Sequence, residues 1–515
     1  MSMVQDIILI LDFGGQYCHL ISRRIRENNV RSEIVPHDIS LKDLQELSLK
    51  FNIKGIILSG GPASIYEKNS PRFNKTILKL DIPILGICYG HQLIAHYAGG
   101  IVIPAKTKEY GSSVARIRKH EDIFSGLKDN EQVWMSHGDT VLKIPKDYTI
   151  IADTTDCPIA AYKSRSKHIY GLQWHPEVTH TKNGSKILKN FIFGICNARP
   201  DWKVDALVKT YIKNIKTTVG NKKAIIALSG GIDSTTATSL AAVALHKNLI
   251  AVFVDHGFMR DGEPEKIDAI AKNLGIKYMH INAKGRFLEK IKKIINPETK
   301  RKIIGREFIK VFEEIAKKVD ADYLIQGTIY PDRIESGQSK KSEIIKTHHN
   351  VGGMPSKIKF RGLVEPLKEL YKDEVRELAV KLGLREDIIY RQPFPGPGLA
   401  VRIIGTVTPK KLAILKRADS IVTSEIEDNL KERPWQYFAV LTDTKSTGVR
   451  GDGRSYGYVI AIRIVESDEA MAAAFSKVPY TILERISTKI TNEIPEVVRV
   501  VYDITNKPPS TIEWE

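Results

Sequence analysis

The sequence predicts an α/β protein in which two doubly wound parallel-sheet domains are followed by a smaller α+β domain. Short apolar runs such as 7–11 and 224–227 alternate with helical stretches through most of the chain, which is typical of parallel sheets covered by helices. The pattern changes at the Pro- and Gly-dense segment 391–399, which can be neither a helix nor a central strand. A chain of 515 residues is also too long for one hydrophobic core.

Each part of the chain has its own series of predicted elements. In the first part, apolar strands are expected at residues 7–11, 55–58, 83–87 and 169–172. An amphipathic connecting helix follows over 204–215, and then strands at 224–227, at 249–254 and from Tyr323. The last part predicts helices over 409–430 and 480–493 and strands at 438–441, 458–463 and 497–504. The predicted divisions are residues 1–198, the connecting helix 199–217, and residues 218–392 and 393–515.

The composition is that of an ordinary globular protein, with 42% hydrophobic and 27% charged residues. No apolar stretch approaches the roughly 18 residues that a membrane span needs, and the first eleven residues do not resemble a signal sequence. The four cysteines lack C-x-x-C spacing, which argues against a structural zinc site or a disulfide framework. We expect a cytoplasmic protein with no membrane partner.

The net charge of +18 allows two interpretations. One is a nucleic-acid-binding protein. The other is a protein whose ligands are phosphates and whose lysines mostly solvate its surface. The lysines are spread along the chain without a basic tail or an aromatic-interleaved stripe, so we favour the second interpretation and expect no nucleic-acid partner.

Two strand-to-loop junctions in the first part predict a reactive thiol. Gly86-Ile87-Cys88-Tyr89-Gly90 is a G-x-C-x-G version of the nucleophile elbow, a sharp turn that lifts a side chain out of the sheet. After the strand at 169–172 comes Gln173-Trp174-His175-Pro176-Glu177. His175 can act as the base toward Cys88 while Glu177 orients the imidazole, which makes a Cys/His/carboxylate triad.

These segments, together with Ser59-Gly60-Gly61-Pro62, resemble the three signatures of class I glutamine amidotransferases. The resemblance implies that Cys88 attacks the side-chain amide of glutamine and releases ammonia through a glutamyl thioester. It also implies an oxyanion hole formed by the backbone N–H groups of Gly61 and Tyr89, a large term in acyl transfer. The segment 134–139 resembles a family segment too, but we interpret it as structural and do not assign His137 to catalysis.

The second part begins with a phosphate-binding loop. The strand 224–227 runs into Leu228-Ser229-Gly230-Gly231-Ile232-Asp233-Ser234 and then a helix, so backbone N–H groups and a positive helix end face one point. No lysine follows the glycines, so this is not a Walker loop. The S-G-G-x-D-S pattern resembles the PP-loop of ATP pyrophosphatases, which implies that Ser229, Gly230, Gly231, Ile232, Asp233 and Ser234 bind ATP. Asp255, at a strand end, is placed for a ribose or a metal.

The segment 329–355 has little periodicity and is long enough to be a functional lid. Asp332, Glu335 and Lys346 in it are candidates for handling Mg²⁺ and phosphates, with Asp233 and Asp332 as the metal ligands. The pair His348-His349 suggests a metal, but with no Cys or third His nearby we prefer the lid. The basic segment 296–306 could hold a phosphate, although a solvated charged helix is commoner.

The lid and the C-terminal segment, with the two sites above, resemble the glutamine-hydrolysing GMP synthetase family over nearly the whole chain. The resemblance implies that ATP adenylates the C2 oxygen of XMP and that ammonia displaces AMP to give GMP. It makes the last domain a dimerisation and XMP-binding domain of a homodimer. The candidate XMP residues are Arg306, Arg391, Arg402, Gln436, Lys507, Ile512 and Glu513.

Two other functions remain open from the residues alone. PP-loop adenylation also serves RNA modification, and the positive charge would suit an RNA partner. A different acceptor, such as an acid converted to an amide, would keep the enzyme class but change the substrate. Only the lid and the tail favour XMP.

Overall fold

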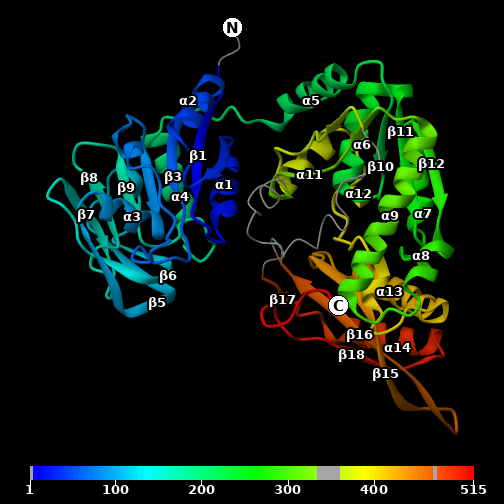
Figure 1. Cartoon of the computed structure of the whole chain (residues 1–515). Helices are drawn as coiled ribbons and strands as arrows, with labels where there is room; N and C mark the ends of the chain where they lie inside the picture. Colours follow the sequence, from blue (N-terminus) through cyan, green and yellow to red (C-terminus); the bar gives the residue numbers. More distant parts are fainter. Residues whose placement is uncertain (1–3, 333–359, 468–471) are drawn as a thin grey trace. The chain divides into compact units, whose positions relative to one another are not determined.

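The computed structural model describes residues 4–332, 360–467 and 472–515, and for Lys106 and Thr107 only the backbone. Glu335, Lys346, His348 and His349 therefore lie outside the described residues. The chain divides into two compact units, Met1–Lys203 and Val204–Glu515, drawn from blue to teal and from green to red in Figure 1. Each unit is described by itself.

The first unit contains a nine-stranded sheet in the order β2-β1-β3-β4-β9-β8-β7-β5-β6. The strands β2, β1, β3, β4 and β9 are parallel neighbours, and the remaining pairs are antiparallel. The strands are β1 (Asp6–Asp12), β2 (Arg31–Pro36), β3 (Asn52–Leu58), β4 (Ile84–Ile87), β5 (Ile101–Ile117), β6 (Asn130–Lys143), β7 (Tyr148–Asp153), β8 (Ala161–Ser164) and β9 (Ile169–Leu172). β1 and β4 are buried along nearly their whole length, because a parallel strand is covered on both faces.

The helices of this unit are α1 (Cys18–Arg26), α2 (Leu41–Lys50), α3 (Tyr89–Tyr97) and α4 (Gly184–Lys189), with the short turns η1 (Lys75–Lys79), η2 (Asp122–Phe124) and η3 (Asn190–Ile195). Ser40 caps α2 by accepting a hydrogen bond from the Asp43 N–H. α3 starts directly after Cys88, so the helix and the β4 strand meet at this residue.

The second unit opens on α5 (Val204–Val219), which covers the stretch where the sequence predicts an amphipathic helix. Its first sheet is fully parallel, in the order β12-β11-β10-β13-β14. The strands are β10 (Ala224–Ala227), β11 (Leu249–Asp255), β12 (Lys277–Asn282), β13 (Tyr323–Ile325) and β14 (Gly362–Val364). The helices around them are α6 (Ile232–Leu245), η4 (His246–Asn248), α7 (Glu263–Asn273), α8 (Lys284–Ile291), α9 (Pro297–Val319), α11 (Lys372–Lys381), α12 (Glu386–Ile389) and η5 (Gly398–Arg402).

The last part of this unit is a four-stranded sheet with two helices. β16 (Gly453–Glu466) pairs with β15 (Gln436–Arg450), β17 (Ala474–Phe475) and β18 (Val497–Tyr502), and the β15–β16 hairpin projects from the unit (Figure 1). Helices α13 (Pro409–Asn429) and α14 (Tyr480–Glu493) pack on the face that carries Tyr437, Ala439 and Leu441. On the other face Ile512, from the C-terminal tail, packs with Phe438 and Val440.

The predicted fold class is confirmed, with one addition. Two doubly wound sheets and a smaller α+β part are present. The first sheet is extended by four antiparallel strands that we did not predict from the sequence. Among the described residues, no helix is long and apolar enough to cross a membrane. All four cysteines are unpaired and buried.

Candidate active sites

The thiol site forms where neighbouring parallel strands end. Cys88 follows β4, Gly60 and Gly61 follow β3, and His175 lies three residues beyond the end of β9. Because β3, β4 and β9 are adjacent and parallel, their carboxyl ends meet at one edge of the sheet. The fold therefore collects three segments that are far apart in the sequence.

Cys88 stands in a strained turn. Its φ is +50°, a left-handed conformation that costs free energy for a residue with a side chain. The flanking glycines permit it, because a Cβ at Gly86 would lie 2.6 Å from the Gly90 backbone and one at Gly90 would lie 2.5 Å from the Leu58 oxygen. The turn holds the Cys88 thiol against the backbone oxygen of Ser136, at 3.4 Å.

His175 and Glu177 complete the array. The Nδ1 of His175 lies 2.6 Å from Oε1 of Glu177, and the ring also hydrogen bonds with Cys88. A Cβ added at Gly60 would lie 2.9 Å from Cε1 of His175 and 3.6 Å from Cβ of Cys88, so only a glycine fits between them. The histidine is 4% and the glutamate 1% exposed, which shields their interaction from water.

The charge state of His175 follows from this environment. Burial disfavours the imidazolium, but the negative charge of Glu177 and the hydrogen bonds with Cys88 and Glu177 outweigh burial and raise the pKa of His175 well above its usual value. The Glu177 carboxylate therefore both orients the ring and stabilises its protonated form.

Two backbone donors near Cys88 have no acceptor among the described residues. Within the described residues, the N–H groups of Gly61 and Tyr89 have no hydrogen-bond partner, whereas the N–H of Cys88 donates to Leu172 and that of Gly90 to Ser59. Tyr89 is the first residue of α3, where a helix leaves its N–H groups unused. These are the two donors that the resemblance to class I glutamine amidotransferases implies for an oxyanion hole.

The glycine loop lies between β10 and α6 in the second unit. Gly230 has φ +75° and Gly231 caps the helix, while the Ser229 and Ser234 hydroxyls lie 2.9 Å apart. Within the described residues, the N–H groups of Ile232 and Asp233, the first two residues of the helix, have no hydrogen-bond acceptor. The loop thus offers unused donors and a positive helix end to an anion.

The acidic residues at this sheet edge have different partners. Asp233 binds Nζ of Lys372 through Oδ2 at 2.6 Å, while its Oδ1 is buried and unpartnered among the described residues. Asp255 accepts from the Gly257 N–H and pairs with Lys284 at 3.1 Å. Asp332 accepts from the Ile329 N–H at 3.1 Å. Lys372 starts α11 and lies 139 positions from Asp233, so no local pattern could reveal it.

The structure brings four of the seven predicted XMP residues together. Glu513 accepts from Arg402 at 2.8 and 3.0 Å and from Gln436 at 3.2 Å. Arg402 is fully buried and lies over the ring of Phe438, 3.8 Å from its centroid. Ile512 is buried beside this group.

The other candidates lie elsewhere. Arg391 binds the Gly230 backbone oxygen at 2.8 Å and the Glu263 carboxylate, which places it at the glycine loop. Arg306 is exposed on α9. Lys507 lies on the tail, where its backbone pairs with that of Ala473.

The basic segment 296–306 is not simply a solvated helix. Lys300, in the first turns of α9, is fully buried, and its Nζ donates to the Ile403 oxygen at 2.7 Å and to the Glu515 carboxylate. Arg301 donates to the Glu515 backbone oxygen. The expectation of solvation is therefore wrong for these two residues, because the C-terminal tail covers them.

Three family descriptions match successive parts of the chain. Residues 9–195 match "Glutamine amidotransferase class-I", residues 204–396 match "NAD synthase", and residues 424–514 match "GMP synthase C terminal domain". The first match contains Cys88, His175 and Glu177, and the second contains the glycine loop.

Full-length relatives are more specific. A GMP synthase [glutamine-hydrolyzing] of Caldicellulosiruptor saccharolyticus is 51% identical over 516 residues, and that of Caldanaerobacter subterraneus subsp. tengcongensis is 51% identical over 518 residues. Both alignments cover 100% of this chain and of the relative. A thiol site on one sheet and a PP-loop on another define a glutamine amidotransferase joined to an ATP-consuming ligase. With this identity over its whole length, the chain belongs to the glutamine-hydrolysing GMP synthase family, which makes GMP from XMP with glutamine and ATP.

Proposed function

We propose that the two units divide this reaction, with glutamine hydrolysed at Cys88 in the first and the C2 oxygen of XMP adenylated beside the glycine loop in the second. The observation that carries the proposal is the buried array of Cys88, His175 and Glu177 beneath a strained elbow. An assay with glutamine, ATP and XMP should yield GMP, AMP and pyrophosphate in equal amounts. Hydrolysis to ADP and phosphate instead would contradict the adenylation step.

In the first unit His175 takes the proton of the Cys88 thiol and becomes the imidazolium, the sulfur attacks the amide carbon of glutamine, and the C=O electron pair moves to oxygen. The N–H groups of Gly61 and Tyr89 stabilise this oxyanion, a contribution of about 3 kcal/mol per donor in comparable sites. The imidazolium of His175 gives its proton to the departing nitrogen, so ammonia leaves and a glutamyl thioester remains. Water, deprotonated by His175, then releases glutamate.

The raised pKa of His175 predicts the pH dependence of this step. Because protonated His175 supplies the proton for ammonia, glutamine hydrolysis should fall as the pH rises through that raised pKa. Replacing Glu177 by Gln removes the charge that raises the pKa, so the alkaline limb of the rate profile should move to lower pH. Glutaminase rates of both proteins across the pH range check this, and an unmoved limb would contradict the role of Glu177.

In the second unit the N–H groups at the start of α6 and the Ser229 and Ser234 hydroxyls receive the ATP phosphates. The unpartnered Oδ1 of Asp233 fits a Mg²⁺ ligand, since a hard cation prefers carboxylate oxygens together with phosphates. Asp332 is the second candidate ligand. When bound, Mg²⁺ would neutralise phosphate charge as pyrophosphate departs. Lys372 and Arg391 add positive charge at the same edge.

We place XMP against the tail, with Glu513 at the purine edge and Lys507 at the phosphate. Arg402 and Gln436 hold the Glu513 carboxylate, and Ile512 anchors the tail in the core. The chain acts as a cytoplasmic homodimer through its last domain, whose projecting hairpin exposes Val449 and Tyr456. Sedimentation of the protein tests this assembly, and a monomer at assay concentration would refute it.

The contact between the buried Lys300 and Glu515 allows a test of whether the C-terminal tail contributes to XMP binding. Replacing Lys300 by Met should leave the Glu515 carboxylate without its cation and loosen the tail. We expect the KM for XMP to rise about tenfold, equivalent to about 1.4 kcal/mol, in assays with ammonium as the nitrogen donor. Lys302, exposed on the same helix, provides the control Lys302→Met. An equal KM in both variants would contradict a role for the Lys300–Glu515 pair.

A further inference from the structure

One stretch of β6 borders the thiol site on several sides. The Ser136 oxygen accepts from the Cys88 thiol at 3.4 Å, and the Asp139 oxygen accepts from Nε2 of Gln92 at 2.9 Å. The Asp139 carboxylate accepts from the Ser64 hydroxyl at 2.6 Å, just beyond the loop that carries Gly61. A shift of the segment 136–139 would therefore disturb the nucleophile and the oxyanion loop together.

The backbone ladder beside this segment is interrupted at one place. The register between β5 and β6 is irregular between Pro104 and Glu109, which pair with Asp139 and His137. Among the described residues, no β5 residue is paired with Gly138. Bulges of this kind re-aim side chains near active sites but remove ladder hydrogen bonds. At this interruption, side-chain contacts add to the backbone pairs that Ser136, His137 and Asp139 keep with β5.

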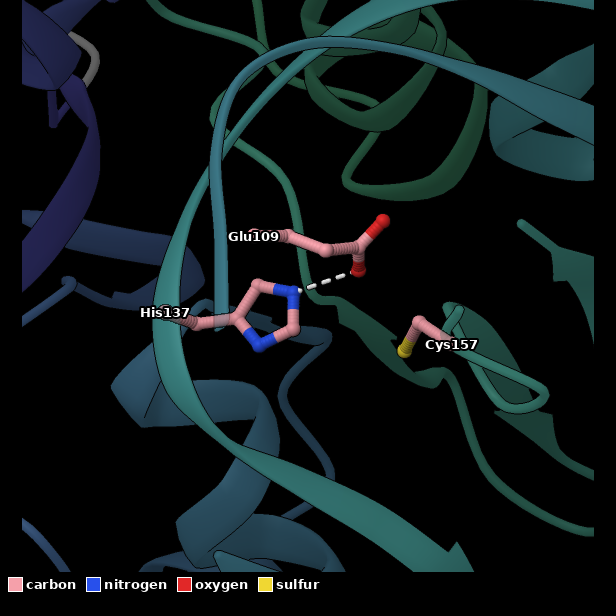
Figure 2. Close-up of side chains that lie close together, drawn as sticks. All are labelled: Glu109, His137 and Cys157. Carbon is pink, nitrogen blue, oxygen red and sulfur yellow. Dashed lines mark hydrogen bonds and ion pairs between the residues drawn. The ribbon is translucent and has the colours of Figure 1, made fainter. Parts of the chain in front are cut away.

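His137 supplies these contacts at both ring nitrogens. Its Nδ1 lies 2.9 Å from the Asp139 backbone oxygen and its Nε2 lies 2.9 Å from Oε2 of Glu109 (Figure 2). A carbonyl oxygen only accepts, so Nδ1 carries a proton. Thr154 donates to the other Glu109 oxygen at 3.2 Å. Both His137 and Glu109 are buried, and breaking a buried polar contact is costly.

A metal ion is the alternative explanation for this cluster. Glu109, His137 and Cys157 offer ligand atoms within 4.8 Å of one another, all buried. However, Nε2 of His137 and Oε2 of Glu109 already satisfy each other, and burial raises the pKa of the Cys157 thiol to about 12. The thiol lies 3.4 Å from the Thr140 hydroxyl. The groups therefore form a hydrogen-bonded array and not a prepared cation site.

We propose that Glu109 and His137 are positioning residues of the glutaminase site, which hold the segment 136–139 against Cys88 and the oxyanion loop. This inference rests on the proposed role of Cys88. Neither side chain touches the reacting atoms, and both act through the backbone oxygens of Ser136 and Asp139.

The test compares Glu109→Leu, which removes the acceptor, with Glu109→Gln, which retains an acceptor for His137. We expect Glu109→Leu to lower the glutamine-dependent kcat about 10²-fold, since small misplacements of a nucleophile have effects of this size. Glu109→Gln should restore a large part of that loss. The rate with ammonium should stay at the wild-type level in both variants. Asp6→Asn is a matched control, because Asp6 is a fully buried carboxylate at the opposite end of the parallel strands.

Thiol alkylation separates displacement from unfolding. All four cysteines are buried, and Cys157 lies in the Glu109 cluster, so Cys18 and Cys196 report unfolding of the first unit. Displacement of the segment should change the labelling rate of Cys88 but not that of Cys18 or Cys196. Glutamine turnover by Glu109→Leu at the wild-type rate would overturn the inference. So would one equivalent of zinc bound to the wild-type protein and lost in Cys157→Ser. If Glu109→Leu labels at all four thiols, that variant has unfolded and the glutamine-dependent kcat of Glu109→Gln decides. A kcat of Glu109→Gln equal to that of Asp6→Asn would refute positioning. If the wild-type protein itself did not use glutamine, the proposed function would be refuted instead.

Discussion

Replacing Cys88 by Ala should abolish glutamine-dependent GMP formation while added ammonium still supports it. The Cys88 thiol forms a hydrogen bond with the His175 ring, and the substitution removes this sulfur. We expect a loss of at least about 10⁴-fold with glutamine, because removal of a covalent nucleophile eliminates the thioester path. Steady-state rates with glutamine and with ammonium, measured on the same preparation, give the two values.

Cys196→Ala is the matched control for this experiment. Cys196 is a buried, unpaired cysteine of the same unit, at the far end of η3, and it makes no hydrogen bond with His175. It should keep both activities. If Cys88→Ala also lost the ammonium reaction, the proposed division of labour between the two units would be wrong. If it kept glutamine use, another group would have to be the nucleophile.

The sequence predicts those parts of the sites that are built from consecutive residues. The elbow around Cys88 and the turn at Gly230 need glycines at fixed offsets, and the structure has tight turns there, with φ +50° at Cys88 and +75° at Gly230. His175 and Glu177 are two residues apart, so their contact is also local. Backbone geometry of this kind leaves a signature in a short window of residues.

The remaining contacts join positions that no short window contains. Lys372 reaches Asp233 across 139 positions, and Lys300 reaches Glu515 across 215. The lysines resemble many others in a chain with 78 lysines and arginines, and only the packing of α9, α11 and the tail selects these two. Two of the four antiparallel strands, β5 and β6, were missed because they are long and carry exposed residues between buried ones, unlike the short apolar parallel strands.

Replacing Asp233 by Asn should strongly slow adenylation in the second unit. The change preserves the shape of the side chain but removes the charge that pairs with Lys372 and that would hold Mg²⁺ through Oδ1. An amide is a poorer ligand for a hard cation, and a lost contact to developing phosphate charge costs about 3–4 kcal/mol, so we expect a decrease on the order of 10²- to 10³-fold. The readout is pyrophosphate release from ATP and XMP with ammonium as donor, which bypasses Cys88.

The Mg²⁺ dependence then separates a ligand from a structural residue. If Asp233 holds the ion, Asp233→Asn should require a higher Mg²⁺ concentration for half-maximal rate, and the remaining activity should recover partly at saturating Mg²⁺. Asp268→Asn is the matched control, because Asp268 is a carboxylate of the same unit whose partners are Tyr278 and His280 on β12. Its Mg²⁺ requirement should equal that of the wild type. If Asp233→Asn has a lower rate but an unchanged Mg²⁺ requirement, Asp233 is not a metal ligand. Its role would then be to hold Lys372 at the glycine loop, and Asp332 would remain as the metal candidate.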